Sequence, residues 1–450
     1  MLNRLNSYFS LLALHVVLAF VVFVAPVFSK LYGVLILVIG IALLLKTKNN
    51  KNQVLVICAY VIGSEVFLRM TNGNILHEMA KYEVILFLVI GMLYSGFSKS
   101  SFVYWFFLIL LLPGVVIGAM TLGYKVDVRK AIAFNIMGEL TLFVSALYCY
   151  RRVVTFEQMG VIIKAIGLPI VTTLIYLFLY APSIKDVVTG TQSNFETSGG
   201  FGPNQVSTIL GLGMFCFFSL FLLYSKNKVA KLIHLLLILI VSYRAIVTFS
   251  RGGVFTGIVM ILLLLFVLFI FSNSKVKSKL ILIFLGCLLI GSGVWVYSVS
   301  QTGGLIEYRY ANQDARGREK EDKLGGREEI AQSEIQMFLD NPIVGIGVGK
   351  NKEYREETTG IVAASHNELT RLLAEHGSLG ILAIMILIFT PLVLYLNNKH
   401  HLFLLSFFVF WALTINHAAM RLAAPAFVYA LSLLKVKFET TNEEPSLHRE

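Results

Sequence analysis

The sequence predicts an all-α polytopic membrane protein with about 12–14 transmembrane helices. Of its 450 residues, 57% are hydrophobic and only 14% are charged, whereas a soluble domain carries about 25% charged residues. Apolar runs that are long enough, or nearly so, to cross a hydrocarbon core of about 30 Å recur along most of the chain. We expect no cleavable signal peptide, because the first apolar run lacks a small-residue cleavage pattern and continues into further spans.

Roughly 14 apolar segments are candidate spans, and two or three of them are short enough to be re-entrant or tilted. They lie at about residues 7–28, 31–45, 53–68, 83–97, 101–118, 131–150, 158–180, 204–224, 232–249, 253–272, 280–298, 378–396, 402–416 and 422–435. We expect each to be a helix, because a helix satisfies its backbone hydrogen bonds internally where water is absent.

The positions of the basic residues predict the orientation of the chain. The formal net charge of +12 could suggest a nucleic-acid partner, but much of the Lys and Arg lies in short connectors between spans. Dense basic clusters recur at every second connector: Lys46–Lys51, Lys99, Arg151–Arg152, Lys226–Lys231, Lys275–Lys279, Lys399 and Lys435–Lys437. The positive-inside rule places these connectors and both termini in the cytoplasm. We therefore expect membrane lipids, and no nucleic acid, as partners.

Four regions follow from this pattern. Residues 1–298 are expected to form an N-terminal transmembrane helical bundle, and 299–366 a large extracytoplasmic loop with short helices. Residues 367–437 are expected to hold the C-terminal transmembrane helices, and 438–450 a polar cytoplasmic tail. Within the loop, the highly charged segment 309–327 is typical of a mobile stretch or of a solvated helix.

The rest of the loop has a helical and then a glycine-rich pattern. The spacing of Ile330, Ile335, Met337 and Phe338 predicts an amphipathic helix, which Asn341-Pro342 ends. Glycines at 345, 347 and 349 predict a flexible loop. We reject a nucleotide phosphate loop here, because no parallel strand precedes the glycines and no Lys-Ser/Thr pair follows them.

The sequence offers no metal or disulfide framework. Cys58, Cys149, Cys216 and Cys287 all lie within apolar spans, without a CxxC motif or a His-rich ligand set. They are expected to be small buried residues. With no Asp-rich metal motif either, we predict chemistry that needs no metal and no cofactor.

A candidate site begins at His366-Asn367, where a polar segment meets an apolar one. Leu369 and Leu372 fall on one helical face after this pair, so His366 lies near a helix start, where free N–H groups attract anions. Gly377 either closes this helix or allows close packing. A His in such a place is often only a cap, and this interpretation stands beside the functional one.

Three further stretches accompany His366-Asn367, Gly377 and Gly380. They are Phe249-Ser250-Arg251-Gly252-Gly253 at the start of a span, Gly326-Arg327 before the amphipathic helix, and the loop Asp340–Gly349. In this order and spacing, the motifs resemble the O-antigen ligase and polymerase superfamily of integral-membrane glycan transferases. The resemblance covers about residues 249 to 380, and the N-terminal half matches only in topology.

The resemblance implies a GT-C-like glycosyltransferase in the bacterial cytoplasmic (inner) membrane, acting in lipopolysaccharide or polysaccharide biosynthesis. Such an enzyme transfers a glycan from a polyprenyl diphosphate carrier, such as undecaprenyl diphosphate, at the extracytoplasmic face. The acceptor is a lipid A core for a ligase, or another lipid-linked glycan for a polymerase. The sequence leaves these two options open and does not fix the oligomeric state.

The candidate catalytic residues are His366, Arg251 and Arg327. Since the unperturbed pKa of His is about 6.5, a neutral His366 is the natural base for an acceptor hydroxyl, with Glu368 and Glu375 as the fallback candidates. Arginine suits a diphosphate because its planar fork binds two oxygens and stays charged. For Arg251 the alternative is snorkelling toward the headgroups.

Further candidates bind substrate: Asn367, Arg371, Arg421, Arg244 and Gly252. Asn367 is expected to orient His366 or to bind a sugar hydroxyl, and Gly252 to let the backbone approach a ligand closely. Arg244 is equally consistent with a structural role, as are Arg69 and Arg129.

The rival class is a transporter or flippase of lipid-linked glycans, which would use the same cations to hold its cargo. A transporter is expected to carry ionisable residues near the middle of the membrane and to show repeat symmetry. The charged residues here lie chiefly near the boundaries, and no convincing repeat is present. The pattern therefore favours an enzyme.

Overall fold

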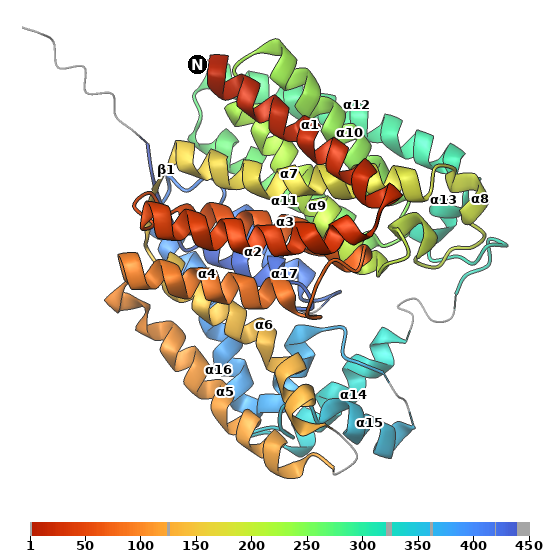
Figure 1. Ribbon diagram of the computed structural model, residues 1–450. Coiled ribbons are helices and arrows are strands. Elements are labelled where there is room, and N and C mark those ends of the chain that lie inside the picture. Colours follow the sequence, from red (N-terminus) through yellow and green to blue (C-terminus); the bar gives the residue numbers. More distant parts are fainter. Residues whose placement is uncertain (1, 124–126, 321–325, 361–362, 419, 439–450) are drawn as a thin grey trace, which may run out of the picture.

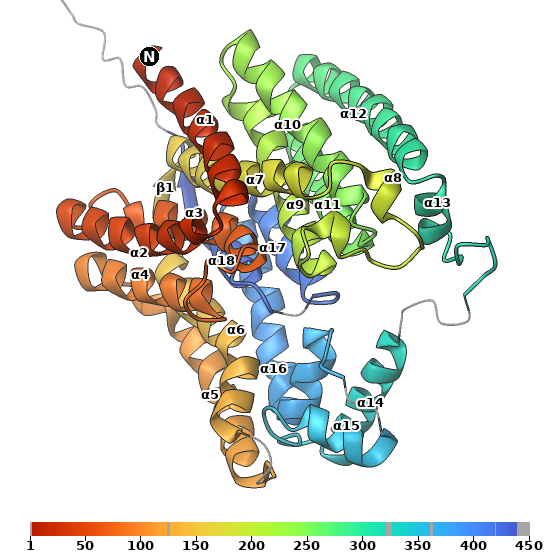
Figure 2. The same ribbon diagram turned by 45° about the vertical axis from the view of Figure 1, so that its right-hand side comes forward.

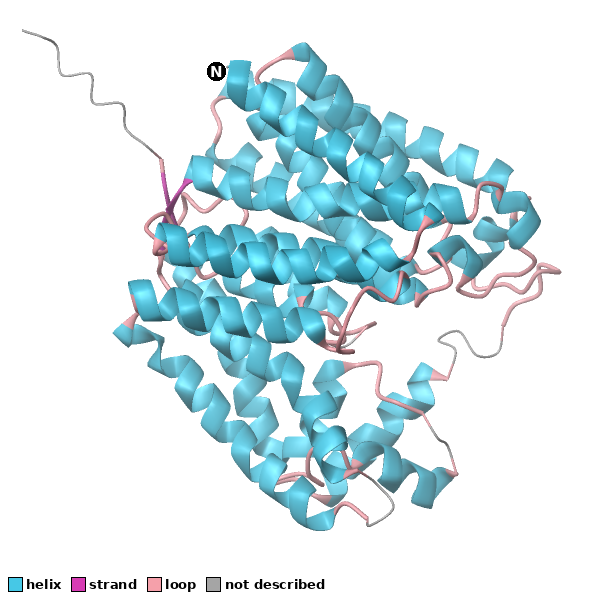
Figure 3. Cartoon of the chain, viewed as in Figure 1, coloured by secondary structure: helices cyan, strands magenta, loops and turns pink. Residues whose placement is uncertain are grey.

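The structure is a computed structural model, and it describes residues 2–123, 127–320, 326–360, 363–418 and 420–438. The described chain is almost entirely helical, and its strands are two short segments (Figures 1 and 3). The helices of the first half are α1 (Leu2–Val24), α2 (Val27–Thr47), α3 (Gln53–Met70), α4 (Met79–Ser95), α5 (Phe102–Thr121), α6 (Val128–Cys149), α7 (Phe156–Tyr180), α8 (Ile184–Val187) and α9 (Pro203–Ser219). Those of the second half are α10 (Lys228–Ile246), α11 (Arg251–Phe271), α12 (Ser274–Gln301), α13 (Leu305–Tyr310), α14 (Arg327–Asp340), α15 (Asn351–Thr359), α16 (Glu368–Leu396), α17 (Leu404–Thr414) and α18 (Ala424–Leu431).

The prediction of an all-α polytopic membrane protein is confirmed. Within the described residues, ten helices are long and apolar enough to cross a membrane, and two shorter apolar helices lie at Tyr8–Val24 and Leu404–Thr414. The two remaining predicted segments correspond to α4, of 17 residues, and α18, of 8 residues. Each of the 14 predicted apolar segments therefore contains a helix.

The connectors with dense basic clusters meet at one end of the bundle. Strand β1 (Val153–Thr155) pairs in parallel with β2 (Lys435–Lys437), which joins two of these connectors. Arg152 donates to the carbonyl of Gly96 in a third, and Asn398 Nδ2 donates to the carbonyl of Leu434 at 2.7 Å. Four of the connectors that carry basic residues are thus in contact with one another.

The intervening connectors meet at another place. The backbone N–H of Asn194 donates to Thr248 O at 3.0 Å, which joins the 181–203 segment to the turn before α11. Arg69 Nη2, in the last turn of α3, donates to Arg421 O at 3.1 Å. In Figure 2, α10, α12 and α13 lie on one side of the molecule and α5, α14, α15 and α16 on the other. The sequence motifs lie in or next to the intervening connectors.

Small residues bring α9 and α11 into close contact. A Cβ added to Gly253 would lie 2.1 Å from Ser207 O, and one added to Gly211 would lie 2.1 Å from Gly253 O. Gly257, one turn further along α11, packs against Gly211 as well. Helices associate closely in membranes where small residues let their backbones approach. Gly253 therefore serves helix packing, and α9 fixes where α11 begins.

Helix α16 bends at Gly377, which has φ 59° and ψ −137°. The bend takes the carbonyls of Ala374 and Glu375 out of the helical ladder, and the N–H groups of Ile346 and Gly347 bond to them at 2.9 and 3.2 Å. The glycine loop predicted to be flexible is thus buried at Gly345 and Gly347 and hydrogen-bonded to α16. It closes the bend of α16, in agreement with the rejection of a phosphate loop.

Candidate active site at the starts of three helices

Four arginines and two histidines gather where α11, α14 and α16 begin. We call this group the arginine site: Arg251, Arg309, Arg327, Arg421, His366 and His417. Arg251 and Arg327 are the first residues of α11 and α14, and His366 precedes α16 by two residues. The N-terminus of a helix presents free N–H groups and the positive end of its dipole. The three helix starts therefore add to the positive charge of the side chains.

Arg251 is held by the segment that follows α12. Its Nη1 donates to Asn312 Oδ1 at 2.6 Å and to Arg309 O at 3.4 Å. Phe249, just before the turn, is buried and has φ 58°, a region that non-glycine residues rarely adopt. Its carbonyl accepts from Arg309 Nε at 3.0 Å. Arg251 and Arg309 are thus tied to one strained turn, and Arg251 is half-buried within the site.

The arginines of this site lack acidic partners. Among the described residues, no ion pair includes Arg251, Arg309, Arg327 or Arg421. Burial lowers the pKa of Arg327, and the charge of Arg251 lowers it further. Burial and the charge of Arg327 likewise lower the pKa of Arg421. Half-buried cations that repel one another stabilise a bound anion, because the anion relieves the repulsion.

His366 is neutral in this surrounding. Burial lowers its pKa to about 4, and the charges of Arg421, Arg327 and Arg355 act in the same direction. Its Nδ1 is buried and has no hydrogen-bond partner among the described residues. The cap of α16 is Asn367, whose Oδ1 accepts from Leu369 N at 2.9 Å. His366 is therefore not the cap, and a neutral imidazole there is able to accept a proton.

A buried ion pair fixes His366 relative to α14. Arg355, on α15, donates to Glu334 Oε1 at 2.8 Å, to Ser333 Oγ at 2.8 Å and to Ala363 O at 2.6 Å. Thr370 Oγ1, on α16, donates to the other oxygen of Glu334 at 2.5 Å. Burial raises the pKa of Glu334, and these partners oppose that rise. The network ties α14, α15 and the start of α16 into one unit.

His417 is a member of the site that sequence reasoning missed. Its Nδ1 donates to Leu413 O at 2.9 Å, and its Nε2 lies 3.2 Å from Thr208 Oγ1. A Cβ added to Gly252 would lie 2.6 Å from two carbons of the His417 ring. The close approach expected at Gly252 is therefore made by His417. Burial lowers the pKa of His417 to about 4, and the charge of Arg327 contributes.

Two arginines that were predicted to bind substrate have guanidinium groups that bond to other parts of the protein. Arg244 is fully buried and donates to the carbonyls of Leu177, Ala181 and Thr197, so it clamps the 181–203 connector. Arg371 is paired with Glu139, Glu368 and Glu375. The structure thus brings together Arg251, Arg327, Arg421 and His366, and leaves Arg244 and Arg371 in structural networks.

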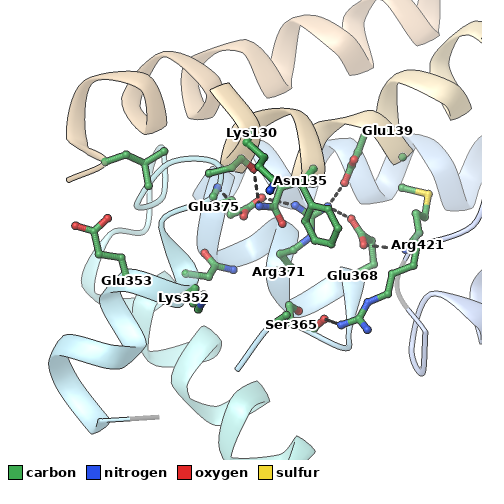
Figure 4. A pocket seen from close by; sticks show the side chains of 18 of the residues that line it. Lys130, Asn135, Glu139, Lys352, Glu353, Ser365, Glu368, Arg371, Glu375 and Arg421 are labelled. Atoms are coloured by element: carbon green, nitrogen blue, oxygen red, sulfur yellow. Dashed lines mark hydrogen bonds and ion pairs between the residues drawn. The ribbon is translucent and has the colours of Figure 1, made fainter. Parts of the chain in front are cut away.

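A polar pocket of about 530 Å³ adjoins the arginine site. Figure 4 shows Lys130, Asn135 and Glu139 on α6 facing Arg371 and Glu375 on α16, with Lys352 and Glu353 on α15. Ser365 and Arg421 line the pocket too, and Arg421 Nη2 donates to Ser365 O at 3.0 Å. Arg421 therefore belongs both to the pocket lining and to the arginine site.

The described residues contain no group of three His, Cys, Asp or Glu side chains arranged to hold a metal ion. The charged groups available to a ligand at the arginine site are guanidinium groups. The arrangement can bind a polyanion, and it can take a proton at His366.

Comparison with known families identifies the region that carries these residues. Residues 236–385 match the family model described as O-antigen ligase. The matched region includes Arg251, Arg309, Arg327 and His366, and it ends before His417 and Arg421. No curated protein matches the chain. The match confirms the resemblance found in the sequence motifs over this third of the chain.

Proposed function

We propose, from the match of residues 236–385 to the O-antigen ligase family model, that the protein transfers a glycan from polyprenyl diphosphate to an acceptor hydroxyl. The reaction is an inverting glycosyl transfer that needs no metal. The donor is carried by a lipid such as undecaprenyl diphosphate, and the reaction takes place at the outer face of the cytoplasmic membrane.

The observation that carries the proposal is the arginine site itself. Four half-buried guanidinium groups without carboxylate partners are costly unless an anion joins them, and a diphosphate supplies oxygens for several bidentate contacts. The site lies at the starts of the apolar helices α11 and α16, and the ends of membrane-spanning helices are where the headgroup of a lipid carrier is expected. The N-termini of three helices point to the same kind of ligand.

In the proposed step, the acceptor oxygen attacks the anomeric carbon of the donor sugar. The bond between that carbon and the diphosphate oxygen breaks, and the leaving diphosphate keeps the electron pair. His366 takes the proton of the acceptor hydroxyl, because its lowered pKa leaves it neutral and able to accept. Arg251, Arg327 and Arg421 stabilise the charge that develops on the diphosphate.

The orientation of the site in the membrane is part of the proposal. The connectors with dense basic clusters share one end of the bundle, so the positive-inside rule puts that end in the cytoplasm. Glu329, on α14, is exposed and suits a test. A Glu329→Cys variant should react with a membrane-impermeant maleimide in intact spheroplasts. Glu157→Cys on α7, at the opposite end, is the control and should react only after lysis. If the Glu329→Cys variant instead reacts only after lysis and the Glu157→Cys variant reacts in intact spheroplasts, the outward assignment is wrong.

Transfer itself is tested with purified protein in proteoliposomes, a lipid-linked oligosaccharide donor and a lipid-linked or lipid A-core acceptor. A transferase forms a covalent donor–acceptor product, and Arg251→Ala abolishes it while the protein remains abundant. Movement of intact donor across the bilayer without any product would support the transporter reading instead. Which acceptor is used decides between ligase and polymerase.

A further inference from the structure

The polar pocket between α6, α15 and α16 differs from the arginine site in its charge. Among its lining residues, five are cationic and six are carboxylates. The cations are Lys81, Lys130, Lys352, Arg371 and Arg421, and the acids are Asp127, Glu139, Glu353, Glu356, Glu368 and Glu375. The near balance of charge does not favour a strongly anionic ligand.

Two buried polar groups in this pocket lack partners. The side chain of Asn351 is only 5% exposed, yet neither its Nδ2 nor its Oδ1 has a hydrogen-bond partner among the described residues. Glu139 is 1% exposed, and its Oε2 is also without a partner, although its Oε1 meets Arg371. Buried polar groups are costly when unpaired, so these atoms point to a ligand that would form hydrogen bonds with them.

The unpaired atoms define the chemistry of that ligand. Asn351 offers an NH2 group that donates and a carbonyl oxygen that accepts, and Glu139 offers an acceptor oxygen, which together suit hydroxyl groups that both donate and accept. Phe134 lines the same pocket and is 46% exposed, so an apolar ring face is available beside the polar groups. Aromatic surface with a few placed polar groups is typical of small-molecule sites, and sugars present both kinds of surface.

The pocket also borders the chain segment that carries the proposed base. Ser365 and Glu368 line it and flank His366-Asn367 in the chain. Arg421 lines the pocket (Figure 4) and also belongs to the arginine site, where its charge acts on His366. A ligand in the pocket and a diphosphate at the arginine site would therefore both lie next to Arg421, so that an acceptor would be held beside the donor.

We infer that this pocket binds the acceptor as an uncharged glycan, held by Asn351, Glu139 and Phe134 with one hydroxyl directed to His366. The inference rests on the proposed function, because it assigns the second substrate of the same reaction. A phosphorylated acceptor fits less well, because the pocket has no excess of positive charge.

The test measures glycan capture and transfer separately. Protein in nanodiscs is applied to an array of neutral bacterial oligosaccharides and of the same oligosaccharides carrying a phosphate monoester. The wild type should capture neutral members, and Asn351→Leu and Phe134→Ala should each weaken capture at least tenfold. Neither substitution removes a hydrogen bond between described residues, so thermal stability should be retained. Phe102→Ala, at a 71% exposed position outside the pocket, is the control and should bind as the wild type.

The outcomes separate the two proposals. If Asn351→Leu and Phe134→Ala leave capture and the KM for the acceptor unchanged while Arg251→Ala abolishes transfer, the pocket assignment is wrong and the glycosyltransferase proposal stands. Preferential capture of the phosphorylated members, or no capture by the wild type, also overturns the assignment. If neutral glycans are captured in the pocket but no transfer is found with any acceptor, the pocket binds glycan and the proposed reaction is wrong.

Discussion

Arg251 and Arg371 are the same residue type in two opposite settings. Arg371 is buried on α16 among Glu139, Glu368 and Glu375, so its charge is more than matched by carboxylates. Arg251 lies on α11 among other cations, and within the described part of the chain its guanidinium group donates to the amide oxygen of Asn312 and to a backbone carbonyl. The first arrangement holds helices together, and we propose that the second is completed by an anionic ligand. Partners therefore distinguish a structural arginine from a functional one.

The largest effect on turnover is expected at His366, the proposed base of the arginine site. His366→Ala should lower turnover by about 10²–10⁴-fold, the usual contribution of a general base. Thermal stability should change little, since its Nδ1 has no partner to lose. Product formation from a purified lipid-linked donor measures the rate. Near-normal turnover in a well-folded variant would remove His366 from the mechanism.

Substitution of Arg371 should instead lower the stability of the protein. Arg371→Met leaves Glu139, Glu368 and Glu375 buried together without a cation, and breaking such a network costs roughly 3–5 kcal/mol. We expect a large fall in the midpoint of thermal unfolding in detergent, with reduced abundance in the membrane. Arg251→Met is the matched control and should keep the midpoint of the wild type. A stable Arg371→Met protein would show that this network does not hold the helices together.

A substitution at the bend of α16 should lower stability by a smaller amount. At Gly377, the backbone angles are unfavourable for any other residue, and an added Cβ would lie 2.7 Å from Gly345 N. Gly377→Ala should therefore destabilise the protein by roughly 1–3 kcal/mol and displace the 345–349 loop. Gly286→Ala on α12, where an added Cβ has open space, is the control. Equal stability of the two variants would contradict the packing described here.

The smallest effect concerns pH. Since the pKa of His366 is lowered to about 4, the base is present at neutral pH and is lost as the pH falls through about 4. Transfer should thus be independent of this group between about pH 5.5 and 8. Arg421→Met removes a nearby positive charge and should move the acid limb of kcat/KM to higher pH. A limb that stays in place would show that Arg421 does not act on His366.

Hydropathy and charge alternation predicted the fold well, because spans of lipid-facing helices must be apolar and their connectors must follow the orientation rule. Motif spacing found Arg251, Arg327 and His366. The sequence could not tell that Arg371 and Arg244 are already engaged, because Glu139 lies 232 positions from Arg371 and Leu177 lies 67 positions from Arg244.

Residues outside the recognised motifs were missed for a related reason. His417 follows a short apolar helix and carries no motif, and only its packing on Gly252 brings it to the site. Arg309 stands in a charged stretch that predicted a mobile or solvated segment, yet α13 and its bond to Phe249 hold it. A weak signal existed for Arg309, since it lies just after a span. Asn351 offered none, because a single Asn at a helix start is common.

The central claim is that the arginine site binds the diphosphate of the lipid carrier, and equilibrium binding of unglycosylated undecaprenyl diphosphate tests it most directly. Wild-type protein in nanodiscs should bind this lipid, and Arg251→Ala should weaken binding at least tenfold, which is about 1.4 kcal/mol. Arg129→Ala, at an exposed arginine on α6, should bind as the wild type. Arg251→Lys should lie between them, because an ammonium keeps the charge and loses the bidentate fork. Equal affinity of Arg251→Ala and the wild type would contradict the assignment of this site to the donor.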